Sequence, residues 1–180
     1  MEQMNQAYKV FTRICLNNWH YIDRKVLGLN ESINFFTGHS GSGKSTVIDA
    51  MQIVLYANTD GRGFFNKAAA DDSDRSLIEY LRGMINIGEN NQAEYKRNKN
   101  FSTTIVLEME QTITKEKECI GVVFDVETAT NEINRLFFWH KGELIPGDYR
   151  TESRAMTIGE VRSYLQQNFP KDEMFYTSNN

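Results

Sequence analysis

The residues with the clearest chemistry lie in the segment INFFTGHSGSGKSTVIDA, from Ile33 to Ala50. Gly38, Gly43, Lys44 and Ser45 fit the pattern G-x-x-x-x-G-K-[ST], which is the Walker A phosphate-binding loop. The glycines of such a loop let successive backbone N–H groups point at phosphate oxygens. The lysine places a positive charge on the β- and γ-phosphates, and the serine hydroxyl is suited to coordinate Mg²⁺. The segment therefore predicts a site for ATP and Mg²⁺.

The whole loop contributes candidate nucleotide ligands, with Ser45 as the candidate metal ligand. They are Gly38, His39, Ser40, Gly41, Ser42, Gly43, Lys44, Ser45 and Thr46. His39 occupies a variable position of the motif, and we expect it to point outward rather than to act in catalysis. The residues after Lys44 are apolar almost all round, which predicts a buried helix packed against a sheet. The positive end of that helix dipole would face the same phosphates.

Hydrolysis would also need an acidic residue at the end of a buried strand, to hold Mg²⁺, and a base to orient water. The segment CIGVVFDVE offers Asp125, but Val126 separates it from Glu127. The segment also belongs to a run of antiparallel strands, whereas a Walker B strand belongs to a parallel core sheet. We therefore expect Asp125 to be an exposed carboxylate at a strand end, and we find no signature motif of the LSGG type. The sequence predicts no confident catalytic residue.

Strand-like segments precede the loop. Tyr8 to Trp19 has β-branched and aromatic residues in partial alternation, which predicts an edge-type strand. A second short strand, a turn at Asn30–Ser32 and a third strand from Ile33 into Gly38 should follow. After the loop helix, which should stop at Asn58–Gly61, we expect an irregular insertion at 62–74.

The segment SDRSLIEYLRG predicts a further helix, with Ser73 as its N-cap and Gly83 as its stop. The polar stretch at 86–100 is expected to be a mobile loop. Three strand-like runs then follow, at 101–113, 117–128 and 133–144. The links between them are too short for crossover helices, so neighbouring strands must be antiparallel and form a β-meander.

The end of the chain carries a helix signal and a strand signal. Thr157 and Glu160 have the spacing of a capping box ahead of the helical pattern TIGEVRSYLQQNF. The final segment MFYTSNN is strand-like. The expected fold class is therefore α/β, with a phosphate-binding loop and an antiparallel meander beside its core sheet.

The composition is that of one globular domain: 180 residues, of which 40% are hydrophobic and 24% charged. A net charge of −4 gives no general attraction to nucleic acid, so any DNA contact must be local. Lys96, Arg97 and Lys99 are the candidates for such a contact, with a solvated loop as the alternative. Cys15 and Cys119 are expected to be reduced core thiols. Without a signal peptide or an apolar run of about 18 residues, we expect a cytoplasmic protein with no membrane partner.

The segments around the loop add a family resemblance. RICLNNWHYID, followed by INFFTGHSGSGKSTVIDAMQIVLY, resembles the N-terminal head segment of SMC-like ATPases, from about Val10 to Tyr176. The similarity is greatest to the SbcC/MukB-like group, which includes the JetC subunit of Wadjet anti-plasmid systems. His20 stands where many relatives have a lysine or arginine. The Q-loop glutamine is not placed: Gln111 is predicted in a hairpin, and Gln166 and Gln167 are predicted in a helix, so none of the three has the expected strand-end setting.

The resemblance implies the N-terminal lobe of an ABC-type head, spanning residues 1–180. In that family a coiled coil and a C-terminal lobe follow the N-terminal lobe, and the C-terminal lobe supplies the signature motif, Walker B and the catalytic glutamate. Two heads sandwich ATP, so the implied partners are the chain's own C-terminal lobe, a second head as homodimer, DNA and kleisin-type accessory subunits. The implied activity is ATP hydrolysis by the complete head, in plasmid defence or chromosome maintenance.

Two other functions fit a phosphate-binding loop. A small-molecule P-loop kinase should alternate strands and helices after Walker A and carry lid arginines, for which Arg62, Arg75 and Arg82 are candidates. A non-catalytic nucleotide-binding module is the third possibility. The antiparallel meander argues against the kinase.

Overall fold

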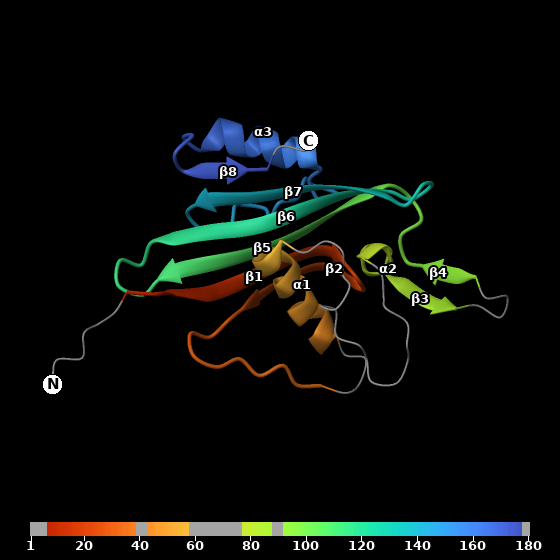
Figure 1. Cartoon of the computed structure of the whole chain (residues 1–180), viewed down its shortest axis with the longest axis horizontal. Coiled ribbons are helices and arrows are strands. Elements are labelled where there is room, and N and C mark those ends of the chain that lie inside the picture. Colours follow the sequence, from red (N-terminus) through yellow and green to blue (C-terminus); the bar gives the residue numbers. More distant parts are fainter. Residues whose placement is uncertain (1–6, 39–42, 58–76, 88–91, 178–180) are drawn as a thin grey trace.

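A six-stranded antiparallel sheet with the strand order β2-β1-β5-β6-β7-β8 is the centre of the molecule (Figure 1). The computed structural model describes residues 7–38, 43–57, 77–87 and 92–177. The strands of the sheet are β1 (Lys9–Trp19), β2 (Ile22–Gly28), β5 (Phe101–Gln111), β6 (Lys117–Glu127), β7 (Glu132–Lys141) and β8 (Met174–Tyr176). The helices are α1 (Lys44–Tyr56), α2 (Leu77–Arg82) and α3 (Ile158–Asn168). A separate hairpin consists of β3 (Met84–Ile87) and β4 (Ala93–Tyr95).

The predicted meander is confirmed, because β5, β6 and β7 pair consecutively and antiparallel. It is not a separate unit beside the first strands, since β1 pairs directly with β5. The prediction of an edge-type first strand was therefore wrong: β1 has β2 on one side and β5 on the other. The partial alternation of apolar and polar residues in β1 did not reveal its internal position. The alternation reports how the two faces of a strand are covered, and it does not report which strands lie beside it.

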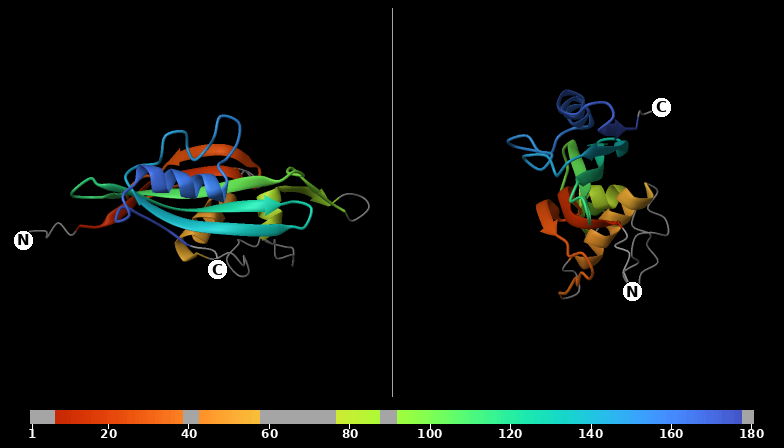
Figure 2. Two further views of the ribbon diagram at one scale, coloured as in Figure 1. Left: turned by 90° about the horizontal axis from the view of Figure 1, so that it is seen from above. Right: turned by 90° about the vertical axis from the view of Figure 1, so that its left-hand side faces the viewer.

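The two faces of the sheet carry separate apolar cores, because successive side chains of a strand point to opposite faces. Val122, Phe124 and Val126 of β6 pack with residues of α1 and α2. Cys119 and Val123 of the same strand pack with α3 and the loop before it. Figure 2 shows α1 and α3 on opposite sides of the sheet. This separation decides which strand residues can reach the phosphate-binding loop.

The predicted strand from Ile33 to Gly38 does not form a ladder with any described strand. It cannot pair with β1, whose two sides are occupied by β2 and β5, and it does not pair with the outer side of β2 either. Phe36 packs against the α1-side core, whereas Ile33 and Phe35 are exposed. The pattern of the segment therefore favours a strand that lacks a partner here.

The polar stretch predicted as a mobile loop was also assigned wrongly in part. It contains strand β4 and the buried side chain of Arg97. The helix predicted before it is confirmed over α2, and Gly83 ends it with a φ of 66°. Ser73, its predicted N-cap, lies outside the described residues, as do the predicted turn at 58–61 and the insertion at 62–74.

The two elements predicted at the end of the chain are confirmed. Thr157 accepts a hydrogen bond from the backbone N–H of Glu160, and Glu160 completes the capping box of α3. Strand β8 pairs antiparallel with β7. Among the described helices, none is long and apolar enough to cross a membrane.

A buried carboxylate joins the sheet to the loop before α3. The Glu108 side chain has no exposed area; it accepts two hydrogen bonds from Arg13, at 2.9 and 2.6 Å, and one from the Leu144 backbone N–H at 3.0 Å. Burial alone would raise the pKa of Glu108. The bonds from Arg13, Leu144 and Thr12 outweigh burial and lower that pKa to about 2.

We expect the free energy of unfolding to fall as the pH drops from about 4.5 towards 2. The lowered pKa means that the unfolded chain takes up a proton on Glu108 before the folded chain does, so the stabilisation is complete above the unfolded value and lost below it. Urea denaturation between pH 7 and pH 2.5 measures this. Glu108→Gln should flatten the dependence, while Glu132→Gln at an exposed position should leave it unchanged. Equal pH profiles for the two variants would contradict the assignment.

Candidate nucleotide-binding site

The N-terminus of α1 is arranged to receive an anion. Its N-cap is Gly43, with a φ of 88°, which has no side chain to cap the helix. The first turn contains no acidic residue. Gly38 at the other end of the loop also has a positive φ, of 152°, and glycine adopts such angles at the lowest cost. The dipole of α1 places its positive end at this glycine-bounded loop, which favours a negatively charged ligand there.

The Lys44 side chain reaches from the start of α1 to the other end of the loop. Its Nζ donates a hydrogen bond of 2.7 Å to the carbonyl oxygen of Gly38. Ser45 is exposed at the start of the helix, whereas Thr46 is buried. These positions suit a lysine that contacts phosphate and a serine that reaches a metal ion. His39, Ser40, Gly41 and Ser42 lie outside the described residues, so their roles stay predictions.

A group of buried side chains holds α1 in place. No role was predicted for these residues from the sequence. The indole N–H of Trp19 donates a hydrogen bond of 2.7 Å to the carbonyl oxygen of Thr46. The Trp19 ring stacks on Tyr80 of α2 at 5.1 Å, and the Tyr80 hydroxyl donates to Asp49 of α1 at 2.7 Å. Trp19 and Asp49 have no exposed area, and Tyr80 has 3%. A charged residue on an otherwise apolar helix was the signal that could have indicated this contact.

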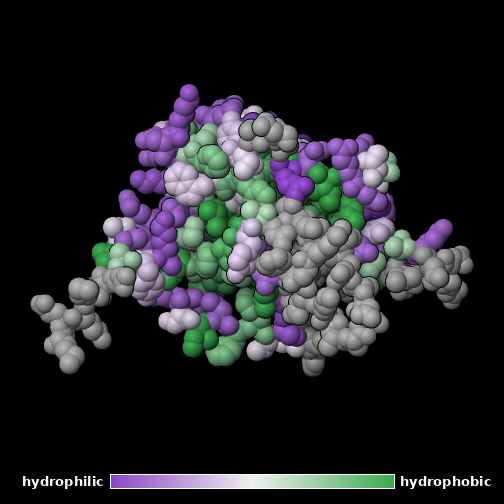
Figure 3. Space-filling view, viewed as in Figure 1, coloured by the Kyte–Doolittle hydropathy of each residue, from purple (hydrophilic) through white to green (hydrophobic). Residues whose placement is uncertain are grey.

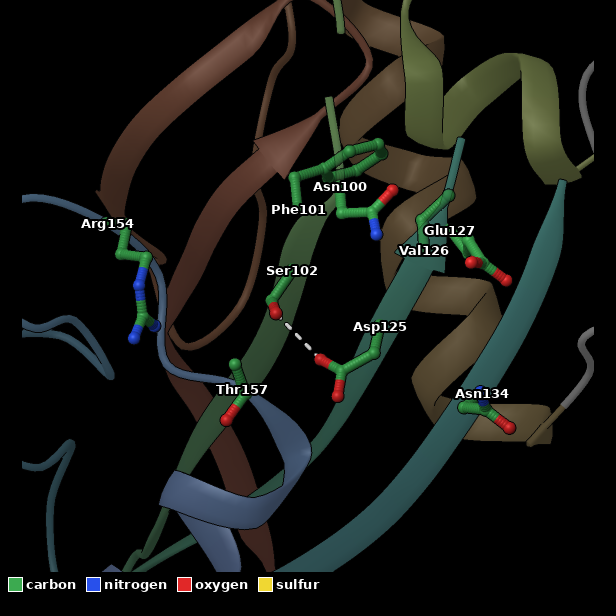
Figure 4. A pocket seen from close by; sticks show the side chains of 9 residues that line it. All are labelled: Asn100, Phe101, Ser102, Asp125, Val126, Glu127, Asn134, Arg154 and Thr157. Atoms are coloured by element: carbon green, nitrogen blue, oxygen red, sulfur yellow. Dashed lines mark hydrogen bonds between the residues drawn. The ribbon is translucent and has the colours of Figure 1, made fainter. Parts of the chain in front are cut away.

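Asp125 lies on the face of the sheet opposite to α1. Its side chain points toward the start of α3 (Figure 4), accepting hydrogen bonds from the Ser102 hydroxyl at 2.7 Å and from the Ile158 backbone N–H at 3.2 Å. It is half-buried rather than exposed, so the expectation of a solvated carboxylate was wrong in that respect. Its neighbours Phe124 and Val126 face α1 instead. Asp125 therefore anchors the N-terminus of α3 and is turned away from the phosphate-binding loop.

In the complete head that the family resemblance implies, we expect Asp125→Asn to leave ATP hydrolysis within a few-fold of the wild-type rate. The asparagine keeps an oxygen that can accept from Ile158, and the side chain remains on the far face of the sheet. Steady-state phosphate release measures the rate, with Lys44→Ala as the inactive reference. A loss of about 10³-fold, the scale of a lost transition-state contact, would show that Asp125 belongs to the site after all.

The predicted DNA-contact residues have different surroundings. Arg97 is buried, and its guanidinium donates to the carbonyl oxygens of His20 and Leu81 at 2.7 and 3.0 Å. Lys96 donates to Asp23 at 2.8 Å, and Lys99 is exposed. Arg97 therefore joins the turn after β1 to α2, whereas Lys96 and Lys99 are both exposed. The DNA contact itself stays a prediction.

His20, His140 and the two cysteines are buried in the packing. Within the described ranges no group of three or more His, Cys, Asp or Glu residues could hold a metal ion. Burial raises the pKa of the Cys15 and Cys119 thiols to about 12, so both remain protonated. Burial also lowers the pKa of His140, whose Nε2 lies 2.7 Å from the Tyr149 hydroxyl. His20 is buried against Tyr21 and Tyr80.

Comparison with known families agrees with this geometry. Residues 11–72 match a family model described as the P-loop containing region of AAA domain. The matched segment begins in β1 and includes the loop and all of α1. The chain is an α/β P-loop domain. Its antiparallel sheet carries the loop helix on one face and α3 on the other.

Two further comparisons add little about function. The sequence matches none of the curated proteins with which it was compared. One similar solved structure is described as "Structural biochemistry of ATP-driven dimerization and DNA stimulated activation of SMC ATPases", with a TM-score of 0.44 and 12% sequence identity. The similarity covers 90% of this chain and 93% of that chain. At this distance the function has to be argued from the P-loop and its surroundings.

Proposed function

We propose that this P-loop domain is the ATP-binding half of an SMC-like ATPase head that acts on DNA. The observation that carries the proposal is the combination of a Walker A sequence, whose lysine lies at the start of α1, with an antiparallel sheet. Lys44 spans the loop at the N-terminus of α1, where the first turn is free of acidic residues. Asp125, the acidic strand residue that could have completed a Walker B motif, faces the other side of the sheet. We infer that the catalytic groups come from a second polypeptide segment.

The surface around α1 supports a docking position for that segment. The sequence predicted α1 to be buried all round, but only one side of it is buried. Ile48, Leu55 and Tyr56 of α1 are exposed at 38%, 44% and 65%. Ile33 and Phe35, in the unpaired segment before the loop, are exposed at 61% and 83%. Figure 3 shows apolar side chains gathered on the face of the molecule seen in Figure 1. Exposed apolar side chains in such number are typical of an interaction surface.

The proposed partner at this surface is the C-terminal lobe of the same head, with its signature motif, Walker B strand and catalytic glutamate. In this arrangement Ile33–Gly38 gains the neighbouring strand that it lacks here. ATP and Mg²⁺ bind at Gly38–Thr46, with Ser45 as metal ligand, and a second head closes over the γ-phosphate. Kleisin-type subunits and DNA, with plasmid defence or chromosome maintenance as the outcome, complete the proposal.

The small-molecule kinase alternative is less well supported. Consecutive strands after α1 are antiparallel, whereas a kinase of that type alternates strands and helices around a parallel sheet. Arg82, a lid candidate, contacts the ring of Tyr95 at 4.0 Å and donates to Asn131 at 2.9 Å. It is thus held within the fold rather than placed beside the loop.

Two assays on the complete protein test the proposal together. We expect ATP hydrolysis that rises when DNA is added, and no transfer of phosphate to small-molecule acceptors. The reason is that the P-loop supplies binding, and positioning groups arrive only when two heads engage. Phosphate release with and without DNA gives the first answer, and radiolabel transfer gives the second. Transfer to an acceptor without DNA stimulation would favour the kinase, and binding without either activity would favour a non-catalytic module.

A further inference from the structure

The turn after β1 and the short helix α2 lie against the buried side of the P-loop helix. Trp19 ends β1, and its indole N–H donates to the Thr46 carbonyl oxygen at 2.7 Å. Thr46 is two residues after Lys44, so this bond fixes the first turn of α1 next to the ammonium group that spans the loop. An indole N–H needs a partner when it is buried, and here that partner is the backbone of the phosphate-binding helix.

A second link reaches α1 one turn further along. Tyr80 stacks on Trp19 with an interplanar angle of 17°, and its hydroxyl donates to Asp49 at 2.7 Å. Asp49 is a fully buried carboxylate five residues after Lys44. A hydrogen bond to a buried charged acceptor is stronger than a neutral one, and its loss leaves the carboxylate without that donor. Trp19 and Tyr80 therefore hold α1 through one backbone and one side-chain bond.

The same two residues belong to a rigid unit on the other side. The Tyr80 carbonyl oxygen accepts from the His20 backbone N–H at 2.9 Å. Arg97 donates to the carbonyl oxygens of both His20 and Leu81. At Gly83 a Cβ atom would lie only 2.7 Å from the His20 carbonyl oxygen, so α2 and the turn after β1 are in close contact. Movement of this unit would move the first turn of α1.

We infer that Trp19 and Tyr80 are positioning residues of the nucleotide site. They set the N-terminal turn of α1, and through it Lys44, at the distance from Gly38 that the phosphates require. The assignment rests on the proposed nucleotide binding and adds two residues that do not contact the nucleotide. It also makes Trp19 an internal reporter, because binding at the loop changes the surroundings of the carbonyl group that its indole contacts.

The first test measures affinity for MgATP by calorimetry in Tyr80→Phe. This variant keeps the stacked ring and loses only the hydroxyl bonded to Asp49. We expect the affinity to fall roughly threefold to tenfold, since one hydrogen bond of the helix anchor is lost. The matched control is Tyr149→Phe, which removes a buried hydroxyl bonded to His140 on the other face of the sheet. It should weaken folding in urea without changing the affinity.

The second test uses tryptophan fluorescence and does not require a substitution at Trp19 or Tyr80. The chain has two tryptophans, so Trp139→Phe leaves Trp19 as the only emitting indole. MgATP should change its emission with the same half-saturation as in calorimetry, and Lys44→Ala should abolish the change. Trp19→Phe, with only Trp139 left, should show no response. If Trp19→Phe does not fold, the response of Trp19 in the Trp139→Phe chain still decides the matter.

The outcomes separate the two hypotheses. Binding of MgATP by the wild type with unchanged affinity in Tyr80→Phe, equal losses in Tyr80→Phe and Tyr149→Phe, or a silent Trp19 would overturn the positioning role alone. No binding of MgATP by the wild type would overturn the proposed function, and the positioning role with it. Reduced affinity confined to Tyr80→Phe, with a responding Trp19, would support both.

Discussion

Lys44→Ala is expected to lower the affinity of the chain for MgATP by roughly 10- to 100-fold. The lysine Nζ lies 2.7 Å from the Gly38 carbonyl oxygen, at the mouth of the loop where the β- and γ-phosphates would sit. A hydrogen bond to a charged group contributes about 1.5–3 kcal/mol, and each 1.4 kcal/mol is about a tenfold change in affinity. Isothermal calorimetry with MgATP and with MgADP measures the loss.

A matched variant distinguishes the loop from general electrostatics. Lys171 is an exposed lysine in the turn after α3, and Lys171→Ala removes the same charge from the chain. It should bind MgATP as the wild type does, since exposed charges more than a Debye length from a ligand are largely screened at physiological salt. An unchanged affinity in Lys44→Ala would refute the phosphate-loop assignment. Equal losses in the two variants would mean that only net charge matters.

The parts of the fold that sequence predicted well are those decided by neighbouring residues. The links in the meander are too short to allow anything but antiparallel neighbours. The pairing of β5, β6 and β7 therefore followed from the length of these links. The cap of α3 depends on Thr157 and Glu160, which are three residues apart. The P-loop is likewise a local pattern, and its helix begins at Lys44 as expected.

The parts that sequence predicted poorly depend on residues far apart in the chain. Ile33–Gly38 has the composition of a strand, but a strand also requires a pairing partner, and none of the described strands pairs with this segment. Arg97 lies in a polar stretch whose composition predicted exposure to solvent. Its guanidinium instead donates to carbonyl oxygens of the turn after β1 and of α2. The bond from Trp19 to Thr46 joins residues whose relation becomes visible only once β1 and α1 are packed together.

The burial of α1 also depends on a distant partner, which in our proposal lies outside this chain. The residues of α1 are apolar on both sides, which predicts burial on both sides. The sheet covers one side through Val47, Ala50, Ile53 and Val54, and the other side retains Ile48 and Leu55 at the surface. A helix that is apolar all round but covered on one side is typical of one half of a larger core. That interpretation leads to the second large effect that we expect.

We expect the chain by itself to bind MgATP weakly and to release almost no phosphate, and a separately produced C-terminal lobe to raise the rate by about 10³-fold or more. The chain provides Lys44 and Ser45 to hold the phosphates and the metal ion, whereas Asp125 is bonded to Ser102 and Ile158 on the opposite face of the sheet. In our proposal, the groups that orient water and stabilise the transition state arrive with the lobe that covers α1. Phosphate release is followed while the lobe is titrated into a fixed concentration of the chain.

Two controls make that titration decisive. The lobe added to Lys44→Ala should produce no comparable rise, because the cradle is then incomplete. Leu55→Lys, a charge on the exposed side of α1, should weaken the response to the lobe without changing MgATP binding by the chain alone, since Leu55 is exposed and lies about 16 Å along the helix from Lys44. Full hydrolysis by the chain without any added lobe would refute the half-head interpretation, because it would require a complete set of catalytic groups within these residues. The kinase alternative would then be the better explanation of the same P-loop.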